Sequence, residues 1–264
     1  MNKNTKSIEA IDLDIAYDQT VIVENLEMGI PHNKITSIIG PNGCGKSTVL
    51  KAIGRILKPK KGVVYLSGED ISKLPTKNIA QKMAILPQTP TSPSGLSVEK
   101  LVAYGRFPHQ KGFGKLTSKD REIIKWALNV TKLSEFYHRE VDTLSGGQRQ
   151  RVWIAMALAQ QSDMILLDEP TTYLDLAHQL EVLELLYNLN REQNVTIAMV
   201  LHDLNLAARF SDYMIAMRSG KIISHGDARD VLTTENLRDV FSIEAKIIFE
   251  EETKRPVCLT YNLL

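Results

Sequence analysis

The stretch Gly40-Pro41-Asn42-Gly43-Cys44-Gly45-Lys46-Ser47-Thr48 decides the fold, because it has the spacing G-x-x-x-x-G-K-[ST] of a phosphate-binding loop. The run before it, 35–39, is apolar and β-branched and predicts a strand. The segment after it, 49–57, places Leu50, Ile53 and Leu57 on one face and predicts a helix. A strand, a glycine-rich loop and a helix in this order are the context that the motif requires.

Each part of this loop has a chemical reason. Glycines let the backbone N–H groups turn inward around a polyanion, where side chains would block the approach. The following helix N-terminus adds partial positive charge. Lys46 supplies a full charge at the outer phosphates, and the Ser47 hydroxyl is placed to ligate Mg²⁺. We therefore expect all nine residues to contribute to a nucleotide site.

The composition is that of a globular chain of one large domain or two small ones. Of 264 residues, 43% are hydrophobic and 24% are charged, which excludes a disordered protein. The 32 basic and 31 acidic residues leave a net charge of +1, which argues against nucleic-acid binding by bulk electrostatics but leaves a local basic patch open.

Cysteine content and hydropathy indicate the compartment. The two cysteines, Cys44 and Cys258, form neither a disulfide framework nor a metal-type spacing, which favours a reducing compartment. The N-terminus lacks the apolar segment of a signal peptide, and no apolar run approaches the roughly 20 residues that span a bilayer. We expect a cytoplasmic chain that reaches a membrane only through a partner.

Alternating residues at the start of the chain predict a small antiparallel sheet. Ile11, Leu13 and Ile15 alternate with acidic residues, 23–25 breaks the next segment, and alternation resumes over 26–30. Another short strand covers 62–66.

Tyr17 lies in the turn between the first two of these strands. A tyrosine in a turn is most often surface packing, yet one exposed aromatic face is enough to stack on a nucleobase.

Residues 69–160 predict a mainly helical block. The apolar run 83–87 ends at Gln88, and a Pro/Ser/Thr loop follows over 89–95. Ser97 is expected to cap a helix over 98–104, and Ser118 to cap the next helix.

Two later apolar runs without alternation, 164–167 and 196–201, predict strands that are covered on both faces, with a helix over 176–191 between them. Strands that alternate with helices indicate a parallel α/β sheet, in which ligands bind beyond the carboxyl ends of the strands. Asp168-Glu169 and His202 follow two such ends, so we expect them to converge with the phosphate loop.

These three side chains suit phosphoryl transfer to water. The Asp168 carboxylate can hold Mg²⁺, and Glu169 can polarise the attacking water. His202 can touch the γ-phosphate and orient Glu169. The alternatives are a surface acidic pair and a structural histidine.

Leu144 to Gln148 open another helix. This helix N-terminus has a hydroxyl from Ser145 and bare N–H groups from Gly146 and Gly147, and Gln148 follows them. Together these groups predict a second anion site. The motif has no lysine of its own, so we expect it to close on a ligand that is held elsewhere.

The end of the chain predicts two hairpins. One covers 213–224 with a turn at 218–221, and the other lies over 246–249 and 257–261. We expect a small extension over about 245–264 and assign it no role.

The chain resembles the ATP-binding subunits of ABC transporters in the order of its motifs. These are the phosphate loop, Gln88, LSGGQ at 144–148, ILLDEP at 165–170, Tyr173-Leu174-Asp175 and His202. The resemblance covers essentially all 264 residues. More narrowly, 95–109 and 171–179 are similar to the iron(III)-siderophore importer subfamily, although haem and cobalamin importers share much of this pattern.

The resemblance implies the ABC ATPase fold over 1–264. This fold is an α/β P-loop NTPase core with a mostly parallel sheet, an N-terminal antiparallel β-subdomain and a helical subdomain inserted at about 89–160. It implies ATP and Mg²⁺ as ligands, with Tyr17 stacking on adenine. Ser47, Asp168 and Gln88 would hold the metal, and Gln88 would also reach the attacking water.

The same resemblance implies a head-to-tail homodimer. Ser145, Gly146, Gly147 and Gln148 of one copy would close on ATP held by the other, and Asp175 would lie in the loop that crosses the seam. A polytopic permease would dock at 89–115 on the cytoplasmic face of the membrane, and an extracellular binding protein would deliver the cargo.

One departure from the family pattern and two alternative functions remain to be weighed. Many ABC proteins have Ala-Leu-Asp where this chain has Tyr173-Leu174-Asp175, a departure that the subfamily tolerates. A soluble ABC ATPase that acts on nucleic acid would carry coiled-coil insertions or two cassettes, and this chain has neither. A regulator without hydrolysis would not explain Glu169 together with His202.

Overall fold

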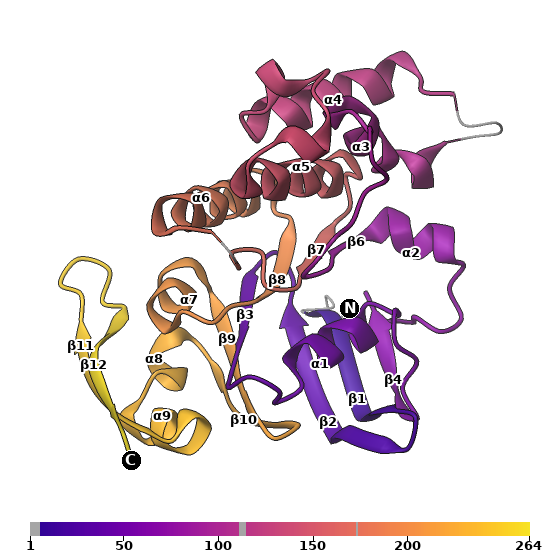
Figure 1. Cartoon of the computed structure of the whole chain (residues 1–264). Helices are drawn as coiled ribbons and strands as arrows, with labels where there is room; N and C mark the ends of the chain where they lie inside the picture. Colours follow the sequence, from indigo (N-terminus) through magenta and orange to yellow (C-terminus); the bar gives the residue numbers. More distant parts are fainter. Residues whose placement is uncertain (1–5, 111–114, 173) are drawn as a thin grey trace. The chain divides into compact units, whose positions relative to one another are not determined.

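The computed structural model describes residues 6–110, 115–172 and 174–264 (Figure 1). Its contacts divide the chain into two units, one formed by 1–74 with 196–264 and the other by 75–195. Tyr173 and the stretch 111–114, which belongs to the expected permease-docking segment, lie outside the described residues. None of the described helices is long and apolar enough to cross a membrane.

The first unit contains an antiparallel sheet and a mixed sheet. The antiparallel sheet has the strand order β2-β1-β4-β5, and the mixed sheet places β3 between the parallel strands β8 and β9, with β10 antiparallel to β9. The strands are β1 (Lys6–Tyr17), β2 (Thr20–Pro31), β3 (Ile35–Ile39), β4 (Lys61–Leu66), β5 (Glu69–Asp70), β8 (Thr196–Val200), β9 (Tyr213–Arg218) and β10 (Lys221–Gly226).

The helices of this unit and a C-terminal hairpin complete it. They are α1 (Lys46–Ile53), α7 (Leu204–Phe210), α8 (Ala228–Val231) and α9 (Thr234–Phe241), with the hairpin strands β11 (Ile243–Phe249) and β12 (Pro256–Leu263). The hairpin lies beside α7 and α9 (Figure 1). The side-chain amide of Asn205 bonds both the N–H and the carbonyl of Cys258, at 2.8 and 3.1 Å. The Arg255 guanidinium donates to carbonyls at the end of α7, including Arg209 O at 2.7 Å. Both predicted hairpins are therefore present.

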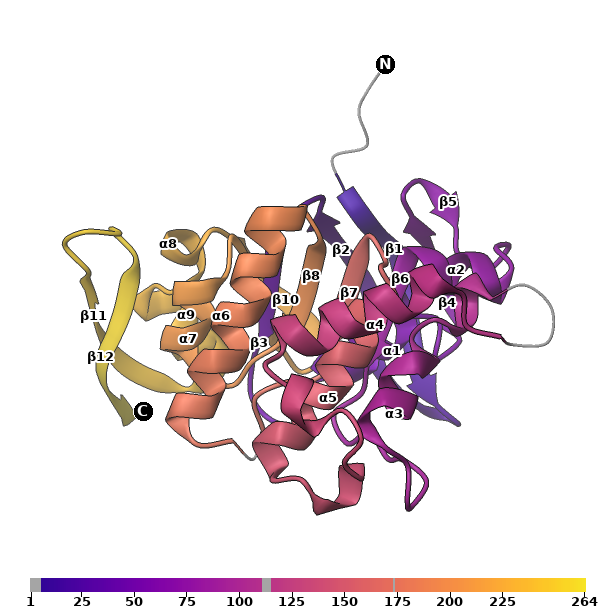
Figure 2. The same cartoon turned by 90° about the horizontal axis from the view of Figure 1, so that it is seen from above.

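The second unit is mainly helical and includes one pair of parallel strands, β6 and β7. Helices α3 and α4 pack against α5 (Figure 2). The elements are α2 (Thr76–Lys82), β6 (Met83–Leu86), α3 (Val98–Tyr104), η1 (Phe107–His109), α4 (Ser118–Val130), η2 (Ser134–Phe136), η3 (Val141–Thr143), α5 (Gly146–Ala159), β7 (Met164–Leu167) and α6 (Leu176–Gln193).

The strands that were predicted from continuous apolar runs are buried along their whole length. Every residue of β3, β7 and β8 is buried, whereas β1 and β2 alternate. This confirms an α/β architecture with parallel strands covered on both faces.

The first two strands differ from the expected pattern because of bulges. The expected break at 23–25 is wrong: β2 continues through Asn25, which takes a φ of 51° and donates from its backbone N–H to Asp14 Oδ1 at 2.7 Å. Asp12, with a φ of 51°, shifts the register of β1, so that Ile11 faces outward while Leu13 is buried.

Three predicted helix boundaries are also wrong. α1 begins at Lys46 rather than Val49, because Gly45 at φ 104° starts the helix directly from the loop, and it ends at Ile53 because the chain turns at Gly54 and Arg55. Thr117, not Ser118, caps α4, in a capping box with Asp120.

The cap at α3 has a different chemistry from the one expected. The Ser97 side chain makes no capping bond. Instead, the carbonyls of Arg139 and Tyr137 accept from the N–H groups of Val98 and Glu99 at 2.9 and 3.0 Å. A neighbouring segment therefore satisfies the donors that a serine hydroxyl was expected to satisfy.

Candidate functional site

The phosphate loop connects β3 to α1 in the first unit, as the sequence predicts. Gly40 takes a φ of 152°, and a Cβ at this position would lie 2.2 Å from the carbonyl oxygen of Met217. Asn42 and Gly43 at the tip are exposed, Pro41 is half-buried, and Cys44, Gly45 and Thr48 are buried. The loop therefore presents its backbone outward at the tip and is fixed from below by β9.

Lys46 is the unusual group of this loop, because its side chain is buried although it is a cation. The residue is 5% exposed, and its ammonium donates to the carbonyl oxygens of Gly40 and Pro41 at 2.9 Å each. Among the described residues, no carboxylate forms an ion pair with it. A buried cation without a countercharge is costly in the ligand-free protein, and an anion at the loop would relieve that cost.

The thiol of Cys44 is not a chemical partner of this site. Cys44 is buried, and burial raises the pKa of the thiol, while Lys46 partly opposes the shift. The backbone of Cys44 has structural bonds, since its carbonyl accepts from Gly220 N at 2.9 Å. The thiol therefore stays protonated and unreactive.

His202 lies at a strand end next to the loop. β3 and β8 are parallel neighbours, with Ile38 opposite Val200, and Leu201 N donates to Ile38 O at 3.2 Å. The neighbouring strand ends therefore lead into the phosphate loop and into His202, as the strand-end argument predicts. Asp203 then caps α7 by accepting from Leu206 N at 2.8 Å, which fixes the backbone that follows His202.

Tyr17 is the last residue of β1 and precedes the turn at 18–19, so its expected position within the turn is wrong by one residue. It is 43% exposed, so part of its side chain is accessible to a ligand.

Gln88 and Glu169 meet in the second unit. The amide Nε2 of Gln88 donates to Glu169 Oε2 at 2.6 Å. This holds because the parallel strands β6 and β7 end side by side, with Leu86 opposite Leu167 and Asp168 N donating to Leu86 O at 2.9 Å. Two residues 81 positions apart are thereby brought to one carboxylate.

Glu169 has a further partner that sequence reasoning missed. The hydroxyl of Thr172 donates to the same Oε2 at 2.9 Å. Glu169 takes a φ of 53°, a strained conformation for a residue with a side chain, and the two bonds hold its carboxylate in a fixed direction. A hydroxyl three residues after an acidic residue in a tight turn is the signal that could have identified Thr172.

Asp168 is 4% exposed, deeper than Glu169. The two neighbouring carboxylates therefore stand in different surroundings, which fits different tasks for them. The carboxylate of Asp168, the hydroxyl of Ser47 and the amide of Gln88 are oxygen donors of the kind that Mg²⁺ accepts.

The donors fit a metal that arrives with a nucleotide rather than a free-standing metal site. Within 6–110, 115–172 and 174–264, no three His, Cys, Asp or Glu side chains gather as metal ligands. Mg²⁺ typically uses one or two protein ligands together with substrate phosphates and water. Of Ser47, Gln88 and Asp168, only Asp168 is a carboxylate, so the chemistry of these residues fits a metal that arrives with phosphates rather than one held by protein ligands alone.

Ser145 caps α5, which begins at Gly146, as the sequence predicts. Ser145 Oγ accepts from Gln148 N at 3.3 Å, and Gln148 Oε1 accepts from Ser145 N at 3.0 Å. Ser145 and Gly146 are exposed, and Gly147 is half-buried. In the same unit, Asp175 is the N-cap of α6 and accepts from His178 N at 2.9 Å.

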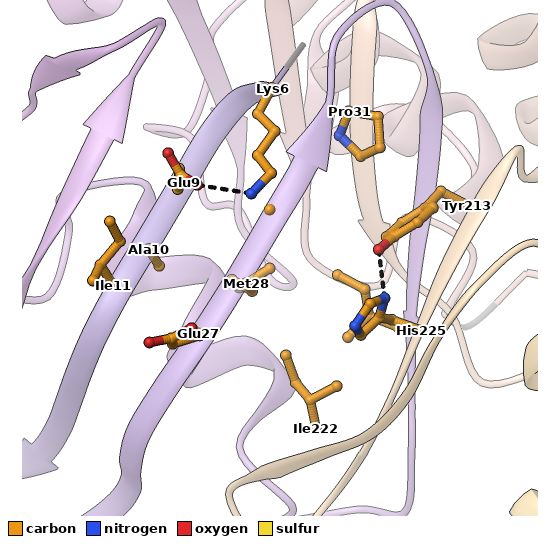
Figure 3. A pocket seen from close by; sticks show the side chains of 12 residues that line it. Lys6, Glu9, Ala10, Ile11, Glu27, Met28, Pro31, Tyr213, Ile222 and His225 are labelled. Atoms are coloured by element: carbon orange, nitrogen blue, oxygen red, sulfur yellow. Dashed lines mark hydrogen bonds and ion pairs between the residues drawn. The ribbon is translucent and has the colours of Figure 1, made fainter. Parts of the chain in front are cut away.

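A pocket of about 420 Å³ in the first unit is separate from these residues (Figure 3). Its polar groups bond one another: Lys6 Nζ lies 2.7 Å from Glu9 Oε1, and Tyr213 Oη lies 2.7 Å from His225 Nδ1. The one lysine of this pocket is already paired with a carboxylate, and Glu27 adds another negative charge to the lining, so the phosphate loop is the stronger anion site.

The comparisons with known proteins agree with this geometry. Residues 23–172 match the family model described as ABC transporter. The chain is 59% identical over 258 residues to the iron(3+)-hydroxamate import ATP-binding protein FhuC of Bacillus subtilis (strain 168), covering 98% of this chain and 96% of the relative. It is 42% identical to the ferric enterobactin transport ATP-binding protein FepC of Escherichia coli (strain K12), covering 97% and 95%.

A solved structure has the same fold. It is the dimeric structure of MJ0796, a bacterial ABC transporter cassette, with a TM-score of 0.75 and 29% identity, covering 83% of this chain and 98% of that one.

Proposed function

Because this chain belongs to the ABC transporter family of ATP-binding proteins, we propose that it is the ATPase subunit of an importer that takes up iron(III)–siderophore complexes. The proposed cargo rests on one observation, the 59% identity over nearly the whole chain to an iron(3+)-hydroxamate import subunit. ATP binding and ATPase activity follow from the family itself.

The grip on the triphosphate is assigned to the phosphate loop. Gly40 to Thr48 would surround the phosphates with N–H groups, and Lys46 would exchange its two carbonyl acceptors for phosphate oxygens. Tyr17 would stack on the adenine with its exposed face. Burial of Lys46 without an ion pair supports this role, because the loop is electrostatically incomplete without an anion.

Hydrolysis is assigned to Glu169, supported by Gln88, Thr172 and His202. The carboxylate of Glu169 would accept a proton from the attacking water, while the two bonds at its Oε2 fix its orientation. His202 would contact the outer phosphate from the end of β8. Mg²⁺, held by Ser47, Asp168 and Gln88, would neutralise charge on the phosphates.

A second copy of the chain would complete the site. The loop at 145–148 has N–H groups at a helix N-terminus but no lysine, so it would bind phosphate weakly alone. Leu176, next to Asp175, is 65% exposed, as expected for a residue that a second subunit covers. We therefore assign Ser145, Gly146, Gly147, Gln148 and Asp175 to the partner's nucleotide.

The remaining assignments follow the family. We propose one ABC ATP-binding domain over 1–264, with its helical subdomain at about 89–160 and an extension at about 245–264. A membrane permease would dock at 89–115 on the cytoplasmic face of the membrane, and a substrate-binding protein would act on the outer side. The proposed partners do not include a nucleic acid.

Growth on defined iron sources tests the proposal. In the organism that encodes this chain, deletion in a background without other siderophore ATPases should abolish growth when ferric siderophores are the only iron source. The wild-type gene should restore growth, and Glu169→Gln should not, although the protein accumulates normally.

Growth with haem and cobalamin provides the contrast. The proposal predicts that both remain usable after the deletion. Loss of growth on haem or cobalamin with unchanged growth on every siderophore would transfer the assignment to those cargoes. Full rescue by Glu169→Gln would remove Glu169 from hydrolysis.

A further inference from the structure

Two helices of the second unit begin at residues that face the proposed partner nucleotide. α5 begins after Ser145, and α6 begins after Asp175. The two N-caps are 30 positions apart in the chain, so the backbone between them does not by itself hold one beside the other. A physical link between them is needed if they are to meet a second subunit as one surface.

His178 contacts Asp175, the N-cap of α6, through a short bond. Its ring Nδ1 lies 2.7 Å from Asp175 Oδ1, and its backbone N–H donates to the same oxygen at 2.9 Å. These bonds, the backbone one first and the ring second, lower the pKa of the Asp175 carboxyl. An ionised carboxylate only accepts hydrogen bonds, so Nδ1 carries the proton and the orientation of the ring is set by Asp175.

The edge of the same ring packs against the other motif. A Cβ placed on Gly147 would lie 2.9 Å from His178 Cδ2 and 3.3 Å from Cγ. A Cβ placed on the neighbouring Gly146 would meet no atom within 4 Å. The imidazole therefore occupies the space beside Gly147 in particular. Residues 145–148, which we call the signature loop, lie so close to the ring that Gly147 has no room for a side chain.

A second contact joins the helices one turn further along. Arg151 Nη1 of α5 lies 3.3 Å from Glu181 Oε2 of α6. The Arg151 side chain is mostly buried, whereas Glu181 is exposed, so this pair alone is a weak tie. Together with the imidazole it fixes two points on each helix, which limits rotation of one helix against the other.

The simpler interpretation of His178 is that it is only a residue of the first turn of α6. Asp175 caps that turn through its bond to the His178 backbone N–H, which any residue other than proline would provide. The bond to Asp175 needs a side-chain donor at the position of Nδ1, and the contact with Gly147 needs side-chain atoms at the positions of Cγ and Cδ2. A cap requires neither.

We propose that His178 is a positioning residue that locks Asp175 to the signature loop 145–148, so that both meet the second subunit as one rigid edge. The inference depends on the proposed function, since this edge has a task only if two copies close around ATP. His178 itself touches no reacting atom in this arrangement.

The test uses the full chain with Glu169→Gln as the parent, so that bound ATP is not consumed. His178→Ala removes both ring contacts, and His178→Asn keeps a side-chain donor at the position of Nδ1 for Asp175. His138→Ala is the matched control, because His138 is an exposed histidine of the same unit. Dimer formation with Mg-ATP is measured by sedimentation against subunit concentration, and ATP binding to the monomer by titration of a fluorescent ATP analogue.

We expect His178→Ala to raise the subunit concentration for half-dimerisation about tenfold, with analogue affinity unchanged. His178→Asn should recover most of the loss, and His138→Ala should equal the parent. Equal dimerisation of His178→Ala and the parent would overturn the inference, as would an equal loss in His178→Asn. A parent that fails to dimerise would instead contradict the proposed function, so the two failures are distinct.

If His178→Ala does not fold, the comparison of His178→Asn with the parent decides: near-parent dimerisation supports the role of the bond, and a tenfold loss refutes it.

Discussion

At the scale of single residues, Lys46 and Glu169 both have features that are unfavourable for stability. Lys46 is buried with two neutral carbonyls as its partners, and Glu169 takes a positive φ that costs roughly 1–3 kcal/mol in a residue with a side chain. Such features reduce stability and are typical of sites that become favourable when a ligand arrives.

Lys46→Met tests this trade-off. The substitution removes the charge but keeps a long apolar side chain, so the free energy of unfolding without nucleotide should change by less than about 1 kcal/mol or increase. ATP affinity should fall roughly 30- to 150-fold, because a charge-assisted contact to phosphate contributes about 2–3 kcal/mol. Analogue titration and denaturant unfolding measure the two quantities.

Lys51→Met is the control, since Lys51 lies in the same helix after the loop. It should leave ATP affinity unchanged. Wild-type affinity in Lys46→Met, or a loss of several kcal/mol of stability without nucleotide, would contradict the assignment of Lys46.

At the scale of elements, the helices of the second unit are held by a buried ion pair. Arg106 Nε lies 2.8 Å from Asp120 Oδ1, and both side chains are almost fully buried. Arg106 also donates to Ala159 O at 2.8 Å at the end of α5, while Asp120 completes the capping box of α4. The pair thereby connects the segment after α3 with both other helices of the bundle.

Asp120→Ala should reduce the free energy of unfolding by about 3–5 kcal/mol, because it leaves the Arg106 charge buried and unpaired. Asp142→Ala, at an exposed aspartate of the same unit, should change it by less than about 0.5 kcal/mol. Denaturant unfolding of both variants at neutral pH provides the comparison. Equal stability of the two variants would show that the pair does not hold the bundle.

The pH dependence of this difference follows from the pKa of Asp120. Burial opposes ionisation, but hydrogen bonds from Thr117 and Arg106 outweigh it and lower the pKa from 3.8 to about 2. The native state therefore binds this proton less readily than the unfolded chain. Ionised Asp120 contributes its full stabilisation when the pH is above the pKa that the residue has in the unfolded chain. The difference in free energy of unfolding between wild type and Asp120→Ala should become smaller as the pH falls from about 4 towards 2.

Patterns in the sequence predicted the elements better than their ends. Continuous apolar runs identified β3, β7 and β8, and the glycine-rich loop placed the start of the nucleotide site. Bulges at Asp12 and Asn25 were not predictable, because they depend on which residues of the neighbouring strand pair. The missing Ser97 cap has the same origin, since carbonyls 40 positions away replace its hydroxyl.

The sequence allowed a prediction of the residue types of the candidate site but not of its internal contacts. Glu169 and His202 could be identified from their positions after strands, whereas the role of Gln88 came from the resemblance to ABC transporter subunits. The bond from Thr172 to Glu169 and the packing of His178 on Gly147 depend on side-chain directions in turns, which spacing along a chain does not specify.

At the scale of the whole molecule, we propose that one copy of the chain holds two unlike anion sites. The first has Lys46, and the second, at 145–148, has N–H groups and a hydroxyl but no cation. If each copy grips ATP with its first site and covers the partner's ATP with its second, two ATP molecules act as the contact between subunits. Hydrolysis would then remove the γ-phosphate from that contact and release the pair.

The most direct measurement is the mass in solution of the Glu169→Gln protein with and without Mg-ATP, by light scattering across a range of subunit concentrations. We expect monomers without nucleotide and a dimer with Mg-ATP, because the unhydrolysed triphosphate keeps both anion sites engaged. Addition of Lys46→Met to this variant should abolish the dimer. A protein that stays monomeric with Mg-ATP at every concentration, alone or with its permease, would contradict the shared nucleotide and with it the transport assignment.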